Sequence, residues 1–109
     1  MTNWARICRI EDIPPLGARV VRRANGEDVA VFRTADDKVF ALVDKCPHKG
    51  GALSQGIVCG NKVACPLHNW NIALDTGCAL APDEGRTPTV TVKVDAGQIL
   101  LDLAVWEHA

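Results

Sequence analysis

Two short motifs in the middle of this 109-residue chain each combine a cysteine with a histidine. The first is Cys46-Pro47-His48, and the second, after sixteen intervening residues, is Cys65-Pro66-Leu67-His68. Both lie within residues 45–85, where glycines and prolines crowd together. Turns rich in glycine and proline let the backbone curl tightly and aim its N–H groups at a buried anion such as a sulfide. Burial alone would hardly stabilise so loop-rich a segment, so we expect a metal centre rather than a core to order it.

The chemistry of the four side chains is compatible with two kinds of metal centre. Two thiolates and two imidazoles can hold a single Zn²⁺ or a cluster of two irons and two sulfides. Zinc fingers usually pair Cys with Cys and His with His, whereas each motif here contains one residue of each type. Mixed pairs suit a cluster in which one iron takes both cysteines and the other takes both histidines. The pattern therefore favours a [2Fe-2S] cluster, and a zinc-bound interaction module is the alternative.

Composition and charge exclude several other classes of protein. Twelve basic and thirteen acidic residues give a net charge of -1 without any basic cluster, which argues against nucleic-acid binding. The longest apolar run, Ile99-Leu100-Leu101, is far too short to cross a membrane, and the N-terminal residues lack the apolar core of a signal peptide. We therefore expect a cytoplasmic protein without membrane contact. Thiols stay reduced there, so the five cysteines are predicted to be ligands or free thiols.

The hydrophobic pattern predicts an all-β fold. Helical periodicity is nearly absent, and short runs of β-branched residues alternate with turn signals, as in a small antiparallel sandwich or barrel. The length fits one domain, residues 1–109, with a loop-rich metal-binding part at about 45–85. Two hairpins are predicted, one joining strands at 29–32 and 39–43 and the other joining strands at 89–94 and 98–103. Two further elements are expected, an extended segment at 20–21 and a short helical turn at 11–13.

On a small all-β chain, Cys-x-His followed after sixteen residues by Cys-x-x-His resembles the Rieske [2Fe-2S] family. The resemblance covers essentially the whole chain and implies a Rieske-type antiparallel fold with one [2Fe-2S] cluster. It implies that Cys46 and Cys65 bind one iron. His48 and His68 would bind the other, and Pro82 would lie on a third loop that covers the cluster. No residue of the chain is then expected to be catalytic.

Three further segments are similar to the small subunit of cytoplasmic assimilatory NAD(P)H-dependent nitrite reductase. They are Lys49-Gly50-Gly51, Asn69-Trp70 and Pro82-Asp83-Glu84-Gly85. This resemblance implies an electron-transfer subunit of an enzyme that reduces nitrite to ammonium in nitrate and nitrite assimilation. Its partner would be a large catalytic subunit that holds FAD, a [4Fe-4S] cluster and sirohaem.

Two observations bear on how the chain would act. It contains no Gly-x-Gly-x-x-Gly motif after a predicted strand, so the isolated chain is expected to transfer electrons without oxidising a nicotinamide itself. The alternative function is a free-standing Rieske ferredoxin of an aromatic-ring dioxygenase. Many such ferredoxins have glycine after the second histidine, where this chain has Asn69.

The other three cysteines are predicted to have no part in the metal centre. Cys8 lies beside a predicted strand and is expected to be a small core residue. Cys59 and Cys78 lie at turns and are expected to be free thiols, because four ligands already complete the two irons.

Overall fold

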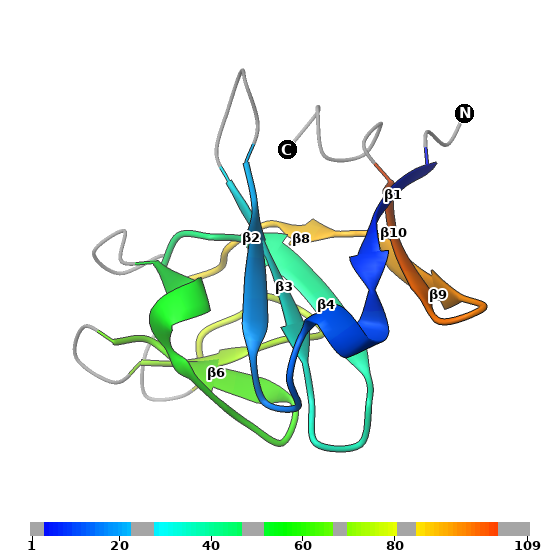
Figure 1. Ribbon diagram of the computed structural model, residues 1–109. Coiled ribbons are helices and arrows are strands. Elements are labelled where there is room, and N and C mark those ends of the chain that lie inside the picture. The colour runs from blue at the N-terminus through cyan, green and yellow to red at the C-terminus, as the bar shows by residue number, and fades with distance from the viewer. Residues whose placement is uncertain (1–3, 23–27, 47–51, 67–69, 81–84, 103–109) are drawn as a thin grey trace.

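The computed structural model describes residues 4–22, 28–46, 52–66, 70–80 and 85–102, which form three antiparallel sheets (Figure 1). The prediction of an all-β antiparallel fold is confirmed. Sheet A contains β1 (Trp4–Arg9), β10 (Gln98–Asp102) and β9 (Val92–Asp95) in that order; sheet B contains β2 (Ala18–Val21), β3 (Val29–Arg33), β4 (Val39–Val43) and β8 (Thr89–Val90); sheet C contains β5 (Ile57–Cys59), β6 (Lys62–Ala64) and β7 (Asn71–Ala73). Two short 3-10 helices, η1 (Ile10–Asp12) and η2 (Leu53–Gln55), complete these elements.

Sheet B is the middle layer of the fold, and strand β3 shows this most clearly. Side chains alternate between the two faces of a strand. Val29 and Val31 belong to the core that sheet B shares with sheet A, whereas Ala30 and Phe32 belong to the core that it shares with sheet C. All four are fully buried, because both faces of β3 are covered. The continuous apolar run of this strand is the expected pattern for such a position.

The second predicted hairpin is confirmed at its turn and corrected at its start. Gln98 pairs with Asp95, and the two turn residues Ala96 and Gly97 have positive φ of 51° and 75°. The segment predicted as one strand over 89–94 is instead divided at Thr91: β8 pairs with β4 in sheet B, and β9 pairs with β10 in sheet A. The chain crosses between two sheets at this point, which the alternation of apolar residues alone does not reveal.

The expectation that a metal centre rather than a core orders residues 45–85 is wrong in one respect, because this part of the chain has a core. Val58, Val63 and Ile72 lie directly opposite one another on the three strands of sheet C, and all three are buried. Leu53 from η2 and Leu74 join them against sheet B. Each strand of sheet C has only three residues, too few for an alternating pattern to be recognised in the sequence.

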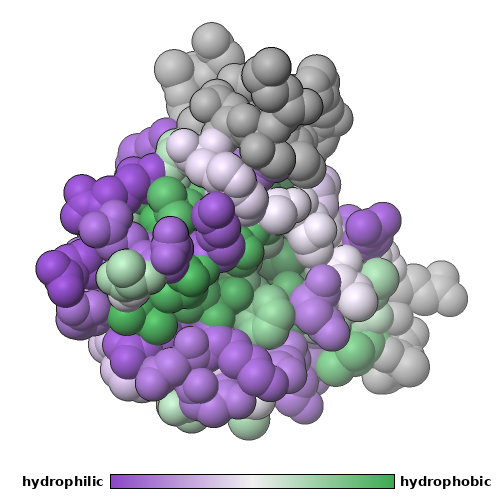
Figure 2. All heavy atoms as spheres, turned by 90° about the vertical axis from the view of Figure 1, so that its right-hand side faces the viewer, coloured by the Kyte–Doolittle hydropathy of each residue, from purple (hydrophilic) through white to green (hydrophobic). Residues whose placement is uncertain are grey.

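The face formed by β1, β9 and β10 shows an apolar area bordered by hydrophilic side chains (Figure 2). Val94 of β9 is 44% exposed.

None of the helical segments in the described part of the chain has the length and apolar character that a membrane crossing requires.

Candidate functional site

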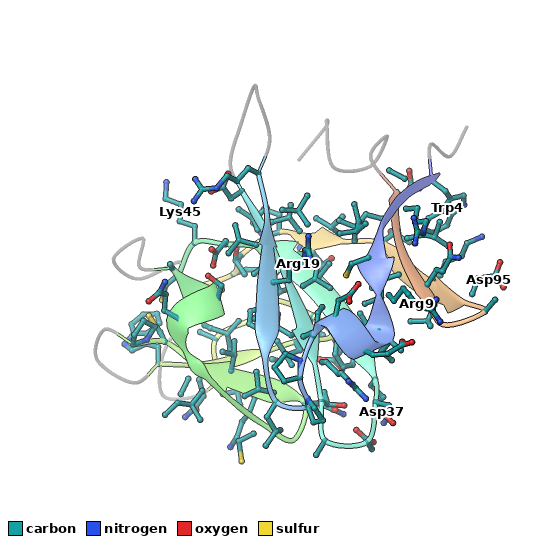
Figure 3. The ribbon with its side chains drawn as sticks, in the orientation of Figure 1. Trp4, Arg9, Arg19, Asp37, Lys45 and Asp95 are labelled. Atoms are coloured by element: carbon teal, nitrogen blue, oxygen red, sulfur yellow. The ribbon has the colours of Figure 1, made fainter. Side chains whose placement is uncertain are left out.

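The first predicted cysteine lies just beyond the end of a central strand. Cys46 follows β4 by three residues, and its side chain is only 1% exposed. The backbone between them is held in place, because Val43 N–H donates to Pro88 O (2.9 Å) and Lys45 N–H donates to Val43 O (2.8 Å). The exposed Lys45 lies on the opposite side of the molecule from Asp95 (Figure 3). Cys46 is therefore at the end of the fold that is remote from the β9–β10 turn.

The second predicted cysteine lies at the tip of a hairpin. Strands β6 and β7 pair up to Ala64 and Asn71, and beyond this pair Cys65 N–H donates to Trp70 O at 2.7 Å. This bond closes the base of the second loop. The Cys65 side chain is fully buried.

The fold brings the two cysteines into the same apolar cluster. Cys46 and Cys65 both belong to the core between sheets B and C, and Trp70 packs against that core. Gly56 allows the chain just before β5 to pack closely against the end of β6, since a Cβ at Gly56 would lie 2.2 Å from the carbonyl oxygen of Ala64. Both thiols are free of disulfides.

A third loop begins beside the hairpin tip. Leu80 N–H donates to Asn71 O (2.8 Å), and Ala79 N–H donates to Gly85 O (2.9 Å). These bonds fix Leu80 and Gly85, the described residues on either side of the segment 81–84. Pro82, predicted to lie on a covering loop, is within this segment and outside the described residues.

The two predicted histidines, His48 and His68, also lie outside the described residues. Of the remaining cysteines, Cys8 is buried in the core between sheets A and B, as predicted. Cys59 and Cys78 are exposed free thiols, again as predicted.

The described donors fit one half of a mixed-ligand cluster. A thiolate in apolar surroundings is costly unless a metal or hydrogen-bond donors compensate its charge, and Cys46 and Cys65 are placed in such surroundings together. Within the described ranges no group of three or more Cys, His, Asp or Glu side chains could hold a metal ion. His48 and His68, the other two predicted ligands, lie outside these ranges.

Two residues at the first loop were missed in the sequence. The carboxylate of Asp44 accepts hydrogen bonds from both the backbone N–H and the hydroxyl of Ser54. The partners are ten residues apart, and no local sequence pattern predicts a contact across such a distance.

Cysteine exposure predicts an order of reactivity toward iodoacetamide in the native protein. Cys59 and Cys78 should be alkylated first, because their side chains are exposed. Cys8 should react slowly, because burial both shields its thiol and raises the pKa of that thiol, which leaves little thiolate at neutral pH. Mass spectrometry of digested protein after timed alkylation measures this order. Urea-unfolded protein, in which all five cysteines should react, is the control, and equal rates for Cys8 and Cys59 in the native state would contradict the prediction.

Comparison with known proteins relates these observations to other chains. The family model of the Rieske [2Fe-2S] domain matches residues 3–93. The chain is 38% identical, over 91 residues, to the 3-phenylpropionate/cinnamic acid dioxygenase ferredoxin subunit of Photorhabdus laumondii, and the match covers 80% of this chain and 84% of that protein. It is 43% identical, over 65 residues, to the probable 3-ketosteroid-9-alpha-monooxygenase oxygenase component of Rhodococcus rhodochrous. That match covers 60% of this chain and only 16% of the longer protein.

A similar solved structure is the putative NADH-dependent nitrite reductase small subunit from Mycobacterium tuberculosis. The two structures superpose with a TM-score of 0.82 at 27% sequence identity. The superposition covers 93% of this chain and 95% of the other.

Proposed function

This chain belongs to the Rieske [2Fe-2S] family, and on that basis we propose that it is the electron-transfer small subunit of a cytoplasmic NAD(P)H-dependent nitrite reductase. The family implies a [2Fe-2S] cluster and an electron-transfer role. The finer assignment is supported by the similarity of nearly the whole chain to a nitrite reductase small subunit. The segments Lys49-Gly50-Gly51, Asn69-Trp70 and Pro82-Asp83-Glu84-Gly85 support it independently.

The proposed ligands of the cluster are Cys46 and Cys65 on one iron and His48 and His68 on the other. The bound cluster supplies a one-electron redox centre. The chain's own residues give the two thiolates a fixed position, Cys46 at the end of β4 and Cys65 at the tip of the β6–β7 hairpin. The buried side chains around them exclude water from the cysteine side of the site.

In this proposal, nitrite is reduced on the large subunit and not on this chain. With four protein ligands in place, both irons of the cluster are fully coordinated, so the chain has no open position at which nitrite could bind. The large subunit, with FAD, a [4Fe-4S] cluster and sirohaem, is the proposed site of that reaction. This chain would contribute electron transfer only.

A second candidate is a free-standing ferredoxin that delivers electrons to an aromatic-ring dioxygenase. The observation in its favour is the 38% identity to a dioxygenase ferredoxin subunit, over 80% of this chain.

The deciding experiment measures nitrite-dependent NAD(P)H oxidation. The isolated chain should show none, and the rate should appear when the chain is mixed with the large subunit of the nitrite reductase. Deletion of the gene should impair growth on nitrite as the sole nitrogen source. Normal growth on nitrite together with failure on an aromatic carbon source would instead favour the ferredoxin.

A further inference from the structure

The carboxylate of Asp44 bridges the two ends of the first loop. Its Oδ1 accepts a hydrogen bond from the backbone N–H of Ser54, and its Oδ2 accepts one from the Ser54 hydroxyl. Both distances are 2.7 Å, within the normal range of hydrogen bonds. The pair is partly buried, so water competes less well for the same atoms.

The Asp44 contact replaces a missing helix cap. Helix η2 starts after Ala52, whose side chain has no oxygen that could accept a hydrogen bond from the first turn. The N–H of Ser54 in that turn would otherwise need water or another acceptor. Asp44, from ten residues earlier in the chain, supplies it.

Both partners are themselves firmly placed. Asp44 N–H donates to Asp28 O at 2.8 Å, directly after the central strand β4. Ser54 follows Leu53, which is fully buried in the same core as Cys46 and Cys65. The bridge therefore joins two rigid points, and the closed ring of residues 44–54 contains Cys46.

We propose that Asp44 and Ser54 form a positioning pair, which we call the loop clamp, that joins the two described ends of the first ligand loop and so retains the cluster. The inference rests on the proposed ligand set, because Cys46 and His48 lie between Asp44 and Ser54 in the sequence. Holding the ends of a short loop together lowers the conformational entropy cost of binding the cluster. Neither residue of the clamp is proposed as a ligand.

The test measures how fast the reconstituted protein loses iron to an excess of an Fe²⁺ chelator after reduction. Ser54→Ala removes the hydroxyl bond and leaves the backbone bond, and Asp44→Ala removes both. We expect iron release to accelerate in both variants, more in Asp44→Ala, by about 10- to 100-fold, the usual effect of removing a residue that supports a metal ligand. Electron paramagnetic resonance of the reduced cluster, recorded before chelation, reports whether each variant starts from an intact cluster.

Conservative variants separate positioning from simple loss of stability. In Asp44→Asn the amide oxygen can still accept from Ser54 N–H, and the amide nitrogen can donate to the Ser54 hydroxyl. Asp44→Asn and Ser54→Thr should therefore release iron at nearly the wild-type rate. If Asp44→Ala does not fold, Ser54→Ala against Ser54→Thr makes the same comparison.

A matched control exists at the opposite end of β4. In the β3–β4 turn the Thr34 hydroxyl donates to the carboxylate of Asp36, which also lowers the pKa of that carboxyl. Asp36→Ala removes the same type of bond far from the ligand loops and should leave iron release unchanged.

The outcomes distinguish this inference from the function on which it rests. If the wild-type protein holds a cluster and both Ser54→Ala and Asp44→Ala release iron at the wild-type rate, the loop clamp alone is overturned. Acceleration in Asp36→Ala equal to that in Asp44→Ala also overturns it, because stability and not position would then govern release. A wild-type protein that takes up no iron and sulfide overturns the proposed ligands and the clamp together.

Discussion

Replacing Cys46 or Cys65 with serine is expected to abolish the cluster. The wild-type chain should contain about two irons and two acid-labile sulfides, and each variant should contain essentially none. A serine hydroxyl is a poor substitute for a thiolate on iron, and both positions are buried, so no water-exposed side chain can take the vacant place. Iron and sulfide assays with the visible absorption spectrum measure the loss.

The same two substitutions should destabilise the fold without unfolding all of it. Ligation contributes to folding free energy, so losing the cluster should lower the free energy of unfolding. The apolar residues Val58, Val63 and Ile72 remain to hold sheet C together. Cys59→Ser, at an exposed thiol, is the control and should keep full iron and sulfide. Stoichiometric zinc without sulfide in iron-replete wild-type protein would contradict the cluster and support the zinc module.

Of the two matched substitutions Gly77→Ala and Gly97→Ala, Gly77→Ala is expected to lower the free energy of unfolding more. Gly77 has a φ of +76°, and a Cβ there would lie 2.1 Å from the carbonyl oxygen of Thr87. The two backbones cannot simply separate, because Thr87 N–H donates to Gly77 O at 2.9 Å. We expect a loss of about 3 kcal/mol or more in the free energy of unfolding, measured by urea denaturation.

Gly97→Ala is the matched control for this prediction. Gly97 has nearly the same φ, +75°, but no atom lies within 4 Å of its Cβ position. Both substitutions carry the cost of placing alanine in the left-handed region, about 1 kcal/mol, so the difference between them measures the clash alone. Equal losses in the two variants would show that the contact with Thr87 has no energetic consequence.

The steric clash created by Gly77→Ala should also disturb the metal site. The Thr87 hydroxyl donates to Val43 O at 3.2 Å, at the end of β4 and three residues before Cys46. Displacing Thr87 therefore disturbs the strand end that carries the first ligand loop. Gly77→Ala should lose iron faster than Gly97→Ala in the same chelator assay.

Local patterns in the sequence were sufficient for the fold class, the first hairpin and the turn of the second, and they also supplied the candidate ligands as a prediction. The turn Asp95-Ala96-Gly97 and the strands 29–33 and 39–43 depend on residues close together in the chain, whose preferences act before any tertiary contact forms. The pairing of cysteine with histidine in each motif is equally local. Its chemistry limited the metals to two before the fold was known.

Only the tertiary structure decided which segments meet. The division of 89–94 between two sheets, the core of sheet C and the bond from Asp44 to Ser54 all depend on partners distant in sequence. Strands of three residues carry too short an alternation to be recognised, and an aspartate has no preferred partner ten residues away. Such contacts become favourable only when the whole chain has brought both groups out of water into one place.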